Sequence, residues 1–218
     1  MNFALSYSGG KDCMLALHRM IKNGAAPVAL IATVNKEQNR AWFHGIQSDL
    51  LNAVSNSLNI PLVLCECLPD EYTQAFEEGL TKSKQMGADA CVFGDIDIDG
   101  HKHWNEERCD KVGLDCVLPL WNQNREALVR EMINEGFKAV IKTIQTDKLD
   151  ESFLGQTLSI PVIERIKAAG VDVCGENGEY HTFVYDGPVF NHPIACEVGE
   201  IIDFGTHKAI DLRHSFLD

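Results

Sequence analysis

The stretch that decides the fold is Leu5-Ser6-Tyr7-Ser8-Gly9-Gly10-Lys11-Asp12, a glycine turn that ends the short apolar run of residues 2–6. Residues 12–23 follow, with apolar side chains at helical spacing, and Gly24 stands where a helix commonly ends. Adjacent glycines let the backbone turn tightly and approach a ligand. The free N–H groups that open the next helix attract an anion. We therefore interpret residues 8–12 as a phosphate-binding loop.

The polar residues of this loop suit the same role. Ser8 supplies a hydroxyl donor, Lys11 supplies a positive charge, and Asp12 can cap the helix or hold Mg²⁺. The loop lacks the G-x-x-x-x-G-K-[ST] pattern of a Walker A motif and the G-x-G-x-x-G pattern of a dinucleotide fold. The alternative is a plain strand-to-helix turn with a surface lysine, which paired glycines directly after a buried strand make the weaker interpretation.

The first half of the chain alternates strand-like and helix-like segments. Expected strands are residues 2–6, 27–34, 61–67 and 90–94, and expected helices are 12–23, 46–58 and 71–86. This order predicts an α/β fold with a doubly wound parallel sheet. Ligands bind such sheets beyond the carboxyl ends of the strands. We therefore expect functional residues just after Ser6, Val34, Cys67 and Phe93.

The second half is less regular and predicts a smaller α+β substrate domain. Expected helices are residues 124–135 and 160–169, and expected strands are 139–146, 182–185 and 197–204. The simple alternation stops near Trp121-Asn122, so the predicted domains are residues 1–121, which bind the nucleotide, and residues 122–218, which bind the substrate. A cleft between two closely packed domains is the expected binding site.

The composition of the chain narrows the classes of partner that it is expected to bind. The chain has 19 lysines and arginines against 32 aspartates and glutamates, a net charge of −13 that disfavours nucleic acid. No uninterrupted apolar run is long enough to span a membrane, and the first residues do not resemble a signal peptide. None of the eight cysteines forms a C-x-x-C pair. We expect a reduced, cytoplasmic protein. Its oligomeric state stays open, and a homodimer is one state the sequence allows.

The loop at residues 5–12 resembles the pyrophosphate loop of the N-type ATP pyrophosphatases, a superfamily with an adenine nucleotide alpha-hydrolase-like, Rossmann-like fold. A second block, Val173-Cys174-Gly175-Glu176-Asn177-Gly178-Glu179-Tyr180-His181-Thr182, resembles the glycine–glutamate loop of the diphthine–ammonia ligase family. Residues 42–46, 118–132 and 154–158 agree with that family in order along the chain. The resemblance thus covers almost the whole sequence.

Three departures from the family pattern stand out. Asn177 occupies a position that is usually glycine, and His181 occupies one that is usually glutamate. Residues 97–107 replace the run that follows the fourth strand in eukaryotic members, although Arg108 fits that pattern. This segment lies beyond a strand end, where we expect the acceptor to bind. The resemblance therefore extends to the use of ATP and leaves the identity of the acceptor open.

The resemblance implies an AMP-forming ligase that uses ATP and Mg²⁺ to join a carboxylate-bearing acceptor to ammonia. It implies catalytic roles for Lys11, Asp12, Glu176 and Glu179 and nucleotide contacts from Ser6, Ser8, Gly9, Gly10, Lys11, Asp12, His44, Gly94 and Asp95. Asp12 is the candidate Mg²⁺ ligand, with Asp95 second. The backbone of Ala32, Thr33 and Val34 is expected to bind adenine. The expected acceptor contacts are Trp104, Arg108, Gly175, Glu176, Gly178, Glu179 and Tyr180.

Two other functions are weighed against this one. A tRNA-thiolating ATP pyrophosphatase shares the loop but calls for a basic surface and catalytic cysteines, and here the charge is negative and the nearest cysteine pair is Cys65-x-Cys67. A sensor that holds ATP or AMP without fast chemistry needs no second-substrate loop, and fold alone leaves it open. The block at residues 173–182 favours the ligase.

Overall fold

The computed structural model describes residues 1–215, and its first half is built around a mostly parallel sheet. Strand β2 lies between β1 and β4, and the order continues from β1 to β5 and β6; the short strand β3 pairs antiparallel with the end of β2. The strands are β1 (Asn2–Ser6), β2 (Ala26–Asn35), β3 (Arg40–Ala41), β4 (Leu62–Cys67), β5 (Ala90–Val92) and β6 (Asp115–Val117). The predicted doubly wound parallel sheet is confirmed.

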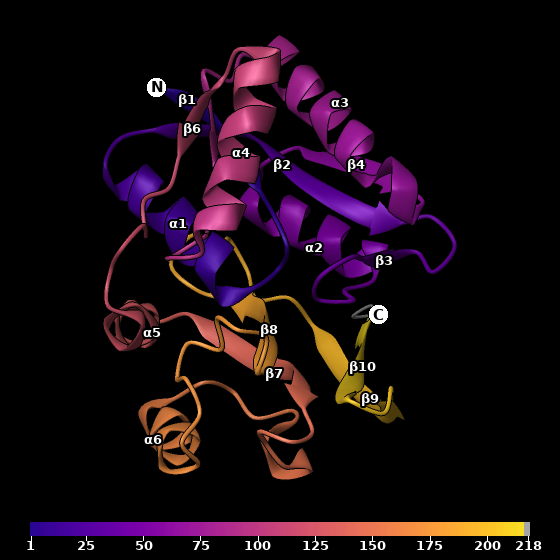
Figure 1. Ribbon diagram of the computed structural model, residues 1–218, viewed down its shortest axis with the longest axis vertical. Coiled ribbons are helices and arrows are strands. Elements are labelled where there is room, and N and C mark those ends of the chain that lie inside the picture. Colours follow the sequence, from indigo (N-terminus) through magenta and orange to yellow (C-terminus); the bar gives the residue numbers. More distant parts are fainter. Residues whose placement is uncertain (216–218) are drawn as a thin grey trace.

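Helices cover both faces of this sheet (Figure 1). They are α1 (Lys11–Lys22), α2 (Ser48–Leu58), α3 (Tyr72–Gln85) and α4 (Asp99–Val112). Successive strand residues point to opposite faces, so Leu30 packs into the core that contains α1 and α2. Ile31 packs into a separate core with Phe76 of α3 and Cys109 of α4. Burial on both faces explains the continuous apolar runs of the sequence.

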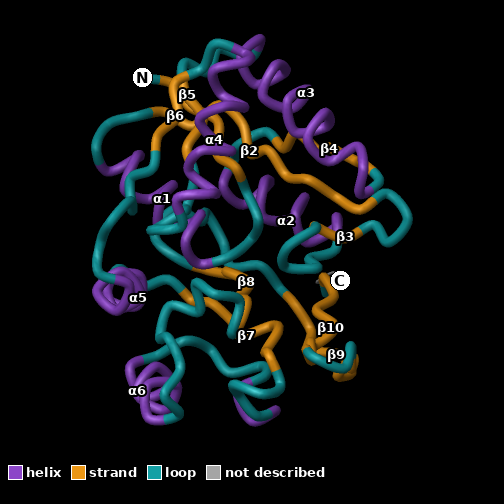
Figure 2. Tube along the Cα trace, in the orientation of Figure 1, coloured by secondary structure: helices purple, strands orange, loops and turns teal. Residues whose placement is uncertain are grey.

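The second half forms an antiparallel sheet in the order β8-β7-β10-β9, flanked by two helices (Figure 2). The elements are α5 (Arg125–Asn134), β7 (Lys138–Gln145), α6 (Ile160–Ala168), β8 (Tyr180–Asp186), β9 (Cys196–Asp203) and β10 (His207–His214). Short 3₁₀ turns occur at Pro69–Glu71 and Glu151–Phe153. The core that holds α1 and α2 continues into this half through Val129 of α5 and Ile141 of β7. The two sheets therefore share one apolar core.

Sequence reasoning located most elements but did not predict α4, β6, β3 or β10. Helix α4 was not predicted because it has few apolar residues; among its side chains only Asn105 and Cys109 are buried. Strands β3 and β6 are too short to show a pattern. The predicted boundary after residue 121 falls between β6 and α5 and stays a prediction. Within residues 1–215, no helix has the length and apolar character needed to cross a membrane.

Candidate active site

Two hydrogen bonds hold the turn between β1 and α1 against the second sheet, and a third joins His44 to the same strand. The N–H of Val184 donates to the carbonyl of Gly9 at 2.9 Å, and the N–H of Lys11 donates to the hydroxyl of Thr182 at 3.1 Å. Nδ1 of His44 donates to the carbonyl of Thr182 at 2.8 Å. Strand β8 therefore fixes the shape of the proposed phosphate loop, and the loop cannot change conformation without disturbing the second half of the chain.

Glycine is required at positions 9, 10 and 94, either by the backbone dihedral angles or because there is no room for a side chain. Gly9 has a φ of +85°, which side chains on L-residues rarely adopt. A Cβ on Gly10 would lie 2.4 Å from Cε1 of His44. A Cβ on Gly94 would lie 2.6 Å from the backbone nitrogen of Cys13, at the start of α1. These contacts let the loop, His44 and the end of β5 converge on one point.

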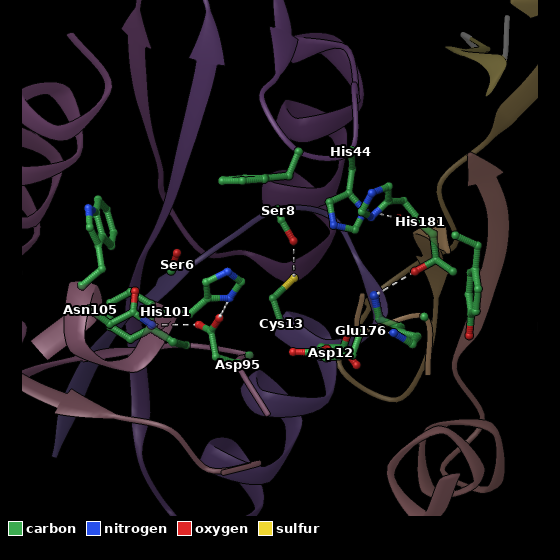
Figure 3. A pocket seen from close by; sticks show the side chains of 18 of the residues that line it. Ser6, Ser8, Asp12, Cys13, His44, Asp95, His101, Asn105, Glu176 and His181 are labelled. Atoms are coloured by element: carbon green, nitrogen blue, oxygen red, sulfur yellow. Dashed lines mark hydrogen bonds and ion pairs between the residues drawn. The ribbon is translucent and has the colours of Figure 1, made fainter. Parts of the chain in front are cut away.

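A cavity of about 430 Å³ opens at this point, beyond the carboxyl ends of the parallel strands (Figure 3). Its lining includes residues after β1, β4 and β5 and residues of the C-terminal glycine–glutamate loop. The lining residues are Ser6, Ser8, Lys11, Asp12, Cys13, Phe43, His44, Tyr72, Phe93, Gly94, Asp95, His101, Trp104, Asn105, Gly175, Glu176, Tyr180, His181 and Thr182. The structure thus brings together residues that stand more than 160 positions apart in sequence.

Lys11 is buried and charged at the floor of the cavity. Its ammonium forms an ion pair of 2.7 Å with Asp12 and lies 5.5 Å from the ring centre of Tyr180. Burial lowers the pKa of Lys11, but the charge of Asp12, together with smaller contributions from Cys174 and Tyr180, leaves the pKa raised. The Tyr180 hydroxyl is occupied, since it donates to the carbonyl of Val173 at 2.6 Å. Lys11 therefore stays a cation beside the loop.

Three carboxylates, Asp12, Asp95 and Glu176, face the same cavity (Figure 3). Burial, and then the charge of Asp12, raise the pKa of Glu176 to about 7; Asp95 adds a smaller contribution of the same sign. A bound cation would reduce the repulsion among these three negative charges. Among residues 1–215, however, no group of three or more His, Cys, Asp or Glu side chains is arranged to hold a metal unaided. This donor set suits Mg²⁺, which usually takes one or two carboxylates and completes its shell with phosphates and water.

The Asp95 carboxylate is oriented by α4. Asn105 donates to Asp95 at 2.8 Å, and Nδ1 of His101 lies 3.0 Å from its other oxygen. The hydrogen bond to Asp95 raises the pKa of His101. The helix that sequence reasoning missed thus supplies three side chains to the cavity lining, His101, Trp104 and Asn105, and fixes the position of a predicted site residue, Asp95.

His44 and His181 line another side of the cavity that contains these three carboxylates (Figure 3). The rings of His44 and His181 lie 4.8 Å apart, centre to centre. Burial lowers the pKa of His44 to about 4, with Lys11 and Lys142 lowering it further. Burial, followed by His44 and Lys11, lowers the pKa of His181 to about 3. Both rings are therefore neutral at pH 7 when no ligand is present.

Aromatic side chains close a third side of the cavity. The ring of Tyr72 lies 5.9 Å from that of Phe43 and 6.0 Å from that of Trp104, centre to centre. The side chain of Phe43 is 63% exposed at the rim. The rings are inclined to one another, at 88° and 43°, and offer an apolar aromatic surface to a base or to an acceptor.

Several predicted site residues lie outside the lining of the cavity. Ala32 and Val34 are buried in the core within β2, and the hydroxyl of Thr33 donates to Tyr72 at 3.3 Å. Tyr72 and Phe43, rather than residues 32–34, thus present side chains to the cavity near the end of β2. The predicted backbone contact between residues 32–34 and adenine stays a prediction.

Glu179, Gly178 and Arg108 also lie outside the lining. Glu179 is 8% exposed and accepts from the backbone N–H of Asn177 at 3.0 Å, so its carboxylate shapes the glycine–glutamate loop. Arg108 lies between α3 and the ring of Trp104, with Nε 3.4 Å from Glu77 and the guanidinium 5.7 Å from the ring centre. Gly9 and Gly10 form the backbone behind the lining residues Ser8 and Lys11. The direct roles predicted for these residues remain untested expectations.

Sequence reasoning missed lining residues for which signals existed. Tyr72 follows the end of β4, a position where functional residues were expected. Phe43 belongs to the block of residues 42–46, and His101 belongs to the segment expected to touch the acceptor. His181 and Thr182 end the block quoted at residues 173–182, so a signal existed for them too, but only the packing of β8 against the loop shows their orientation.

Comparison with known proteins identifies the family to which this chain is similar. Residues 1–116 match the family model of the diphthamide synthase N-terminal domain, and residues 124–215 match that of the diphthamide synthase C-terminal domain. A mouse (Mus musculus) protein named diphthine--ammonia ligase is 28% identical over 228 residues, which cover 93% of this chain and 85% of that protein. The Saccharomyces cerevisiae protein of the same name is 27% identical over 92% of this chain and 36% of its own length.

A solved structure is also similar at low identity. It is titled as a predicted subunit of tRNA methyltransferase from Methanocaldococcus jannaschii, with a TM-score of 0.43 and 16% identity over 84% of this chain and 96% of that one. The two family models together match most of the sequence, in the order expected for one chain. The chain therefore belongs to the diphthamide synthase family of enzymes.

Proposed function

We propose that this protein is an ATP-dependent ligase that activates a carboxylate as an acyl-adenylate and transfers the acyl group to ammonia. One observation carries the proposal: the phosphate loop and the glycine–glutamate loop, from opposite halves of the chain, face one cavity through Asp12 and Glu176. A nucleotide-binding sensor has no need of that second loop. The name of the relatives couples diphthine with ammonia, and we propose a carboxylate acceptor of this class.

In the first step, a carboxylate oxygen of the acceptor attacks the α-phosphorus of ATP, and pyrophosphate leaves. The loop amides at residues 8–10 and the Lys11 ammonium would stabilise the charge that builds on the leaving group. Asp12 and Asp95 would hold Mg²⁺, which neutralises phosphate charge when bound. Catalysis of this step rests on positioning and charge stabilisation.

In the second step, ammonia attacks the acyl carbon, AMP leaves, and an amide forms. Glu176 lies where it can attract ammonium and accept the proton that the new C–N bond releases. A buried carboxyl whose pKa is near 7 is suited to both tasks. The aromatic surface of Phe43, Tyr72 and Trp104 would hold the adenine or the apolar part of the acceptor.

Oxygen labelling tests the adenylation step. A carboxylate acceptor labelled with ¹⁸O is incubated with the protein, ATP, Mg²⁺ and ammonium, and the products are analysed by mass spectrometry. Attack at the α-phosphorus transfers one ¹⁸O atom to AMP and leaves pyrophosphate unlabelled. Label in inorganic phosphate, with ADP as the other product, would contradict the proposal, because it would place the attack at the γ-phosphorus.

A further inference from the structure

Arg125 places a positive charge at the N-terminus of α5, where the local structure gives no reason for one. The turn is already capped, because the side chain of Asn124 accepts from the N–H of Ala127 at 2.9 Å. The N-terminus of a helix carries a partial positive charge and favours acidic side chains over basic ones. Arg125 is also absent from the lining of the cavity, and the proposed mechanism does not use it. The reason for an arginine at this position must therefore lie in its contacts with other segments.

The guanidinium of Arg125 binds two carboxylates that belong to two different loops. Nε and Nη2 donate to the two oxygens of Asp97 at 2.8 and 2.6 Å, and Nη1 donates to Asp172 at 2.6 Å. Asp97 lies in the loop between β5 and α4, and Asp172 lies just before the glycine–glutamate loop. A bidentate pair of this kind fixes orientation as well as distance. Arg125 therefore ties together one loop from each half of the chain.

The Asp172 carboxylate in turn shapes the segment that carries Glu176. It accepts from the backbone N–H of Cys174 at 3.0 Å and from that of Glu176 at 3.4 Å. The N–H of Gly175 donates to the backbone carbonyl of Asp172 at 3.0 Å. Gly175 and Glu176 both line the cavity. The position of Glu176 thus follows from that of Asp172, which Arg125 holds.

Asp97 gives the same guanidinium a hold on the loop that carries Asp95. Asp95 lines the cavity two positions before Asp97, and the buried Ile96 lies between them. The backbone carbonyl of Ile96 accepts from the N–H of Asn122 at 2.7 Å, and α4 orients the Asp95 carboxylate as described above. This loop therefore has other supports, and loss of Arg125 is expected to loosen the glycine–glutamate loop more.

We propose that Arg125 is a positioning residue that sets the separation of Asp95 and Glu176 across the cavity; this inference rests on the proposed function. Arg125 acts from outside the cavity, where it lines a separate open pocket together with Asp97 and Asp172. It touches neither the nucleotide nor the acceptor. The amide-forming step, to which we assign Glu176, depends on this tie more than the adenylation step, which the phosphate loop serves.

Hydrogen exchange of the intact protein, followed by mass spectrometry, tests the tie without reference to activity. Arg125→Met removes the guanidinium and is expected to speed amide exchange about tenfold in residues 173–179, as for loss of a charged hydrogen bond, and by a smaller factor in residues 94–98. Exchange in residues 8–12, which β8 holds, is expected to stay unchanged. Arg130→Met is the matched control, because Arg130 lies on the same helix and pairs with two glutamates outside the cavity lining. It is expected to leave both loops unchanged.

Two activities then separate the steps of the reaction. With diphthine as the probe carboxylate, exchange of labelled pyrophosphate into ATP reports adenylation, and amide formation from ammonium reports both steps. Arg125→Met is expected to lower amide formation about a hundredfold, as for a reacting group displaced by about 1 Å, and to change pyrophosphate exchange less than about twofold. Arg125→Lys keeps the charge without the planar fork and is expected to retain an intermediate rate of amide formation.

Unchanged hydrogen exchange in Arg125→Met would overturn the tie. Faster exchange with normal amide formation would overturn the positioning role and leave the ligase proposal intact. An equal fall in both activities would also overturn that role, because general destabilisation lowers both steps alike. A wild-type protein that does not turn over diphthine would contradict the ligase proposal for this acceptor, and faster exchange of the two loops in Arg125→Met would then still support the tie.

Discussion

The backbone N–H of Lys11 donates a hydrogen bond of 3.1 Å to the hydroxyl of Thr182, although 171 positions separate the two residues. This bond joins the first turn of α1 to β8 and is buried. Thr182→Val keeps the shape of the side chain but leaves the N–H without its acceptor. We expect the free energy of unfolding to fall by about 1–3 kcal/mol, measured in urea, and the KM for ATP to rise.

Thr182→Ser serves as the control, because it keeps the hydroxyl and is expected to retain most of the stability and the KM. If the serine variant loses stability and the valine variant does not, the side chain acts through packing of its methyl group, and the hydrogen bond has no special role in shaping the loop.

Gly10 is predicted to tolerate no side chain. Its backbone has a φ of −84°, so alanine is not strained there, but the added Cβ would lie 2.4 Å from Cε1 of His44. We expect Gly10→Ala to destabilise the fold by about 1–3 kcal/mol through overpacking. Adding His44→Ala should recover much of this loss, because it removes the clashing ring. Gly100→Ala, where nothing lies within 4 Å, is expected to be neutral or stabilising.

The raised pKa of Glu176 makes stability depend on pH in a definite direction. The carboxyl has a pKa of about 7 in the folded protein and 4.5 when unperturbed, so the folded state binds more protons between these values. Its contribution to stability is therefore complete below about pH 4.5 and is lost as the pH rises through 7. In metal-free buffer, Glu176→Gln is expected to be more stable than the wild type at pH 8, and this difference should shrink toward pH 4. Denaturation curves of both proteins at the two pH values check this; the same gain in stability at both would contradict it.

The charges of Lys11 and Asp12 are expected to be needed for turnover but not for folding. Lys11→Met and Asp12→Asn each remove one member of the 2.7 Å ion pair. We expect AMP formation to fall by at least about a hundredfold in both, as when a group that stabilises transition-state charge is removed. Circular dichroism should report an intact fold. Lys22→Met, at the exposed end of the same helix, is the control and should retain activity; normal turnover in the loop variants would remove the pair from the mechanism.

The fold was largely predictable because buried parallel strands and the loop after β1 leave strong local patterns. The site was predictable where it follows strand ends: Asp12, Asp95 and His44 all line the cavity. Contacts between the two halves could not be predicted in this way. Thr182 acquires its contact with the loop only when β8 packs behind it, and the Glu179 carboxylate is turned toward the backbone N–H of Asn177 rather than into the cavity. Helix α4 lacks the apolar periodicity from which a helix can be predicted.

The account depends most on where the triphosphate binds. A crystal structure with Mg²⁺ and an ATP analogue that resists cleavage between the α- and β-phosphates tests this directly. We predict the β- and γ-phosphates against the backbone of residues 8–11, with the α-phosphate open toward Glu176. A triphosphate bound anywhere else, with the loop at residues 8–12 empty, would contradict the account.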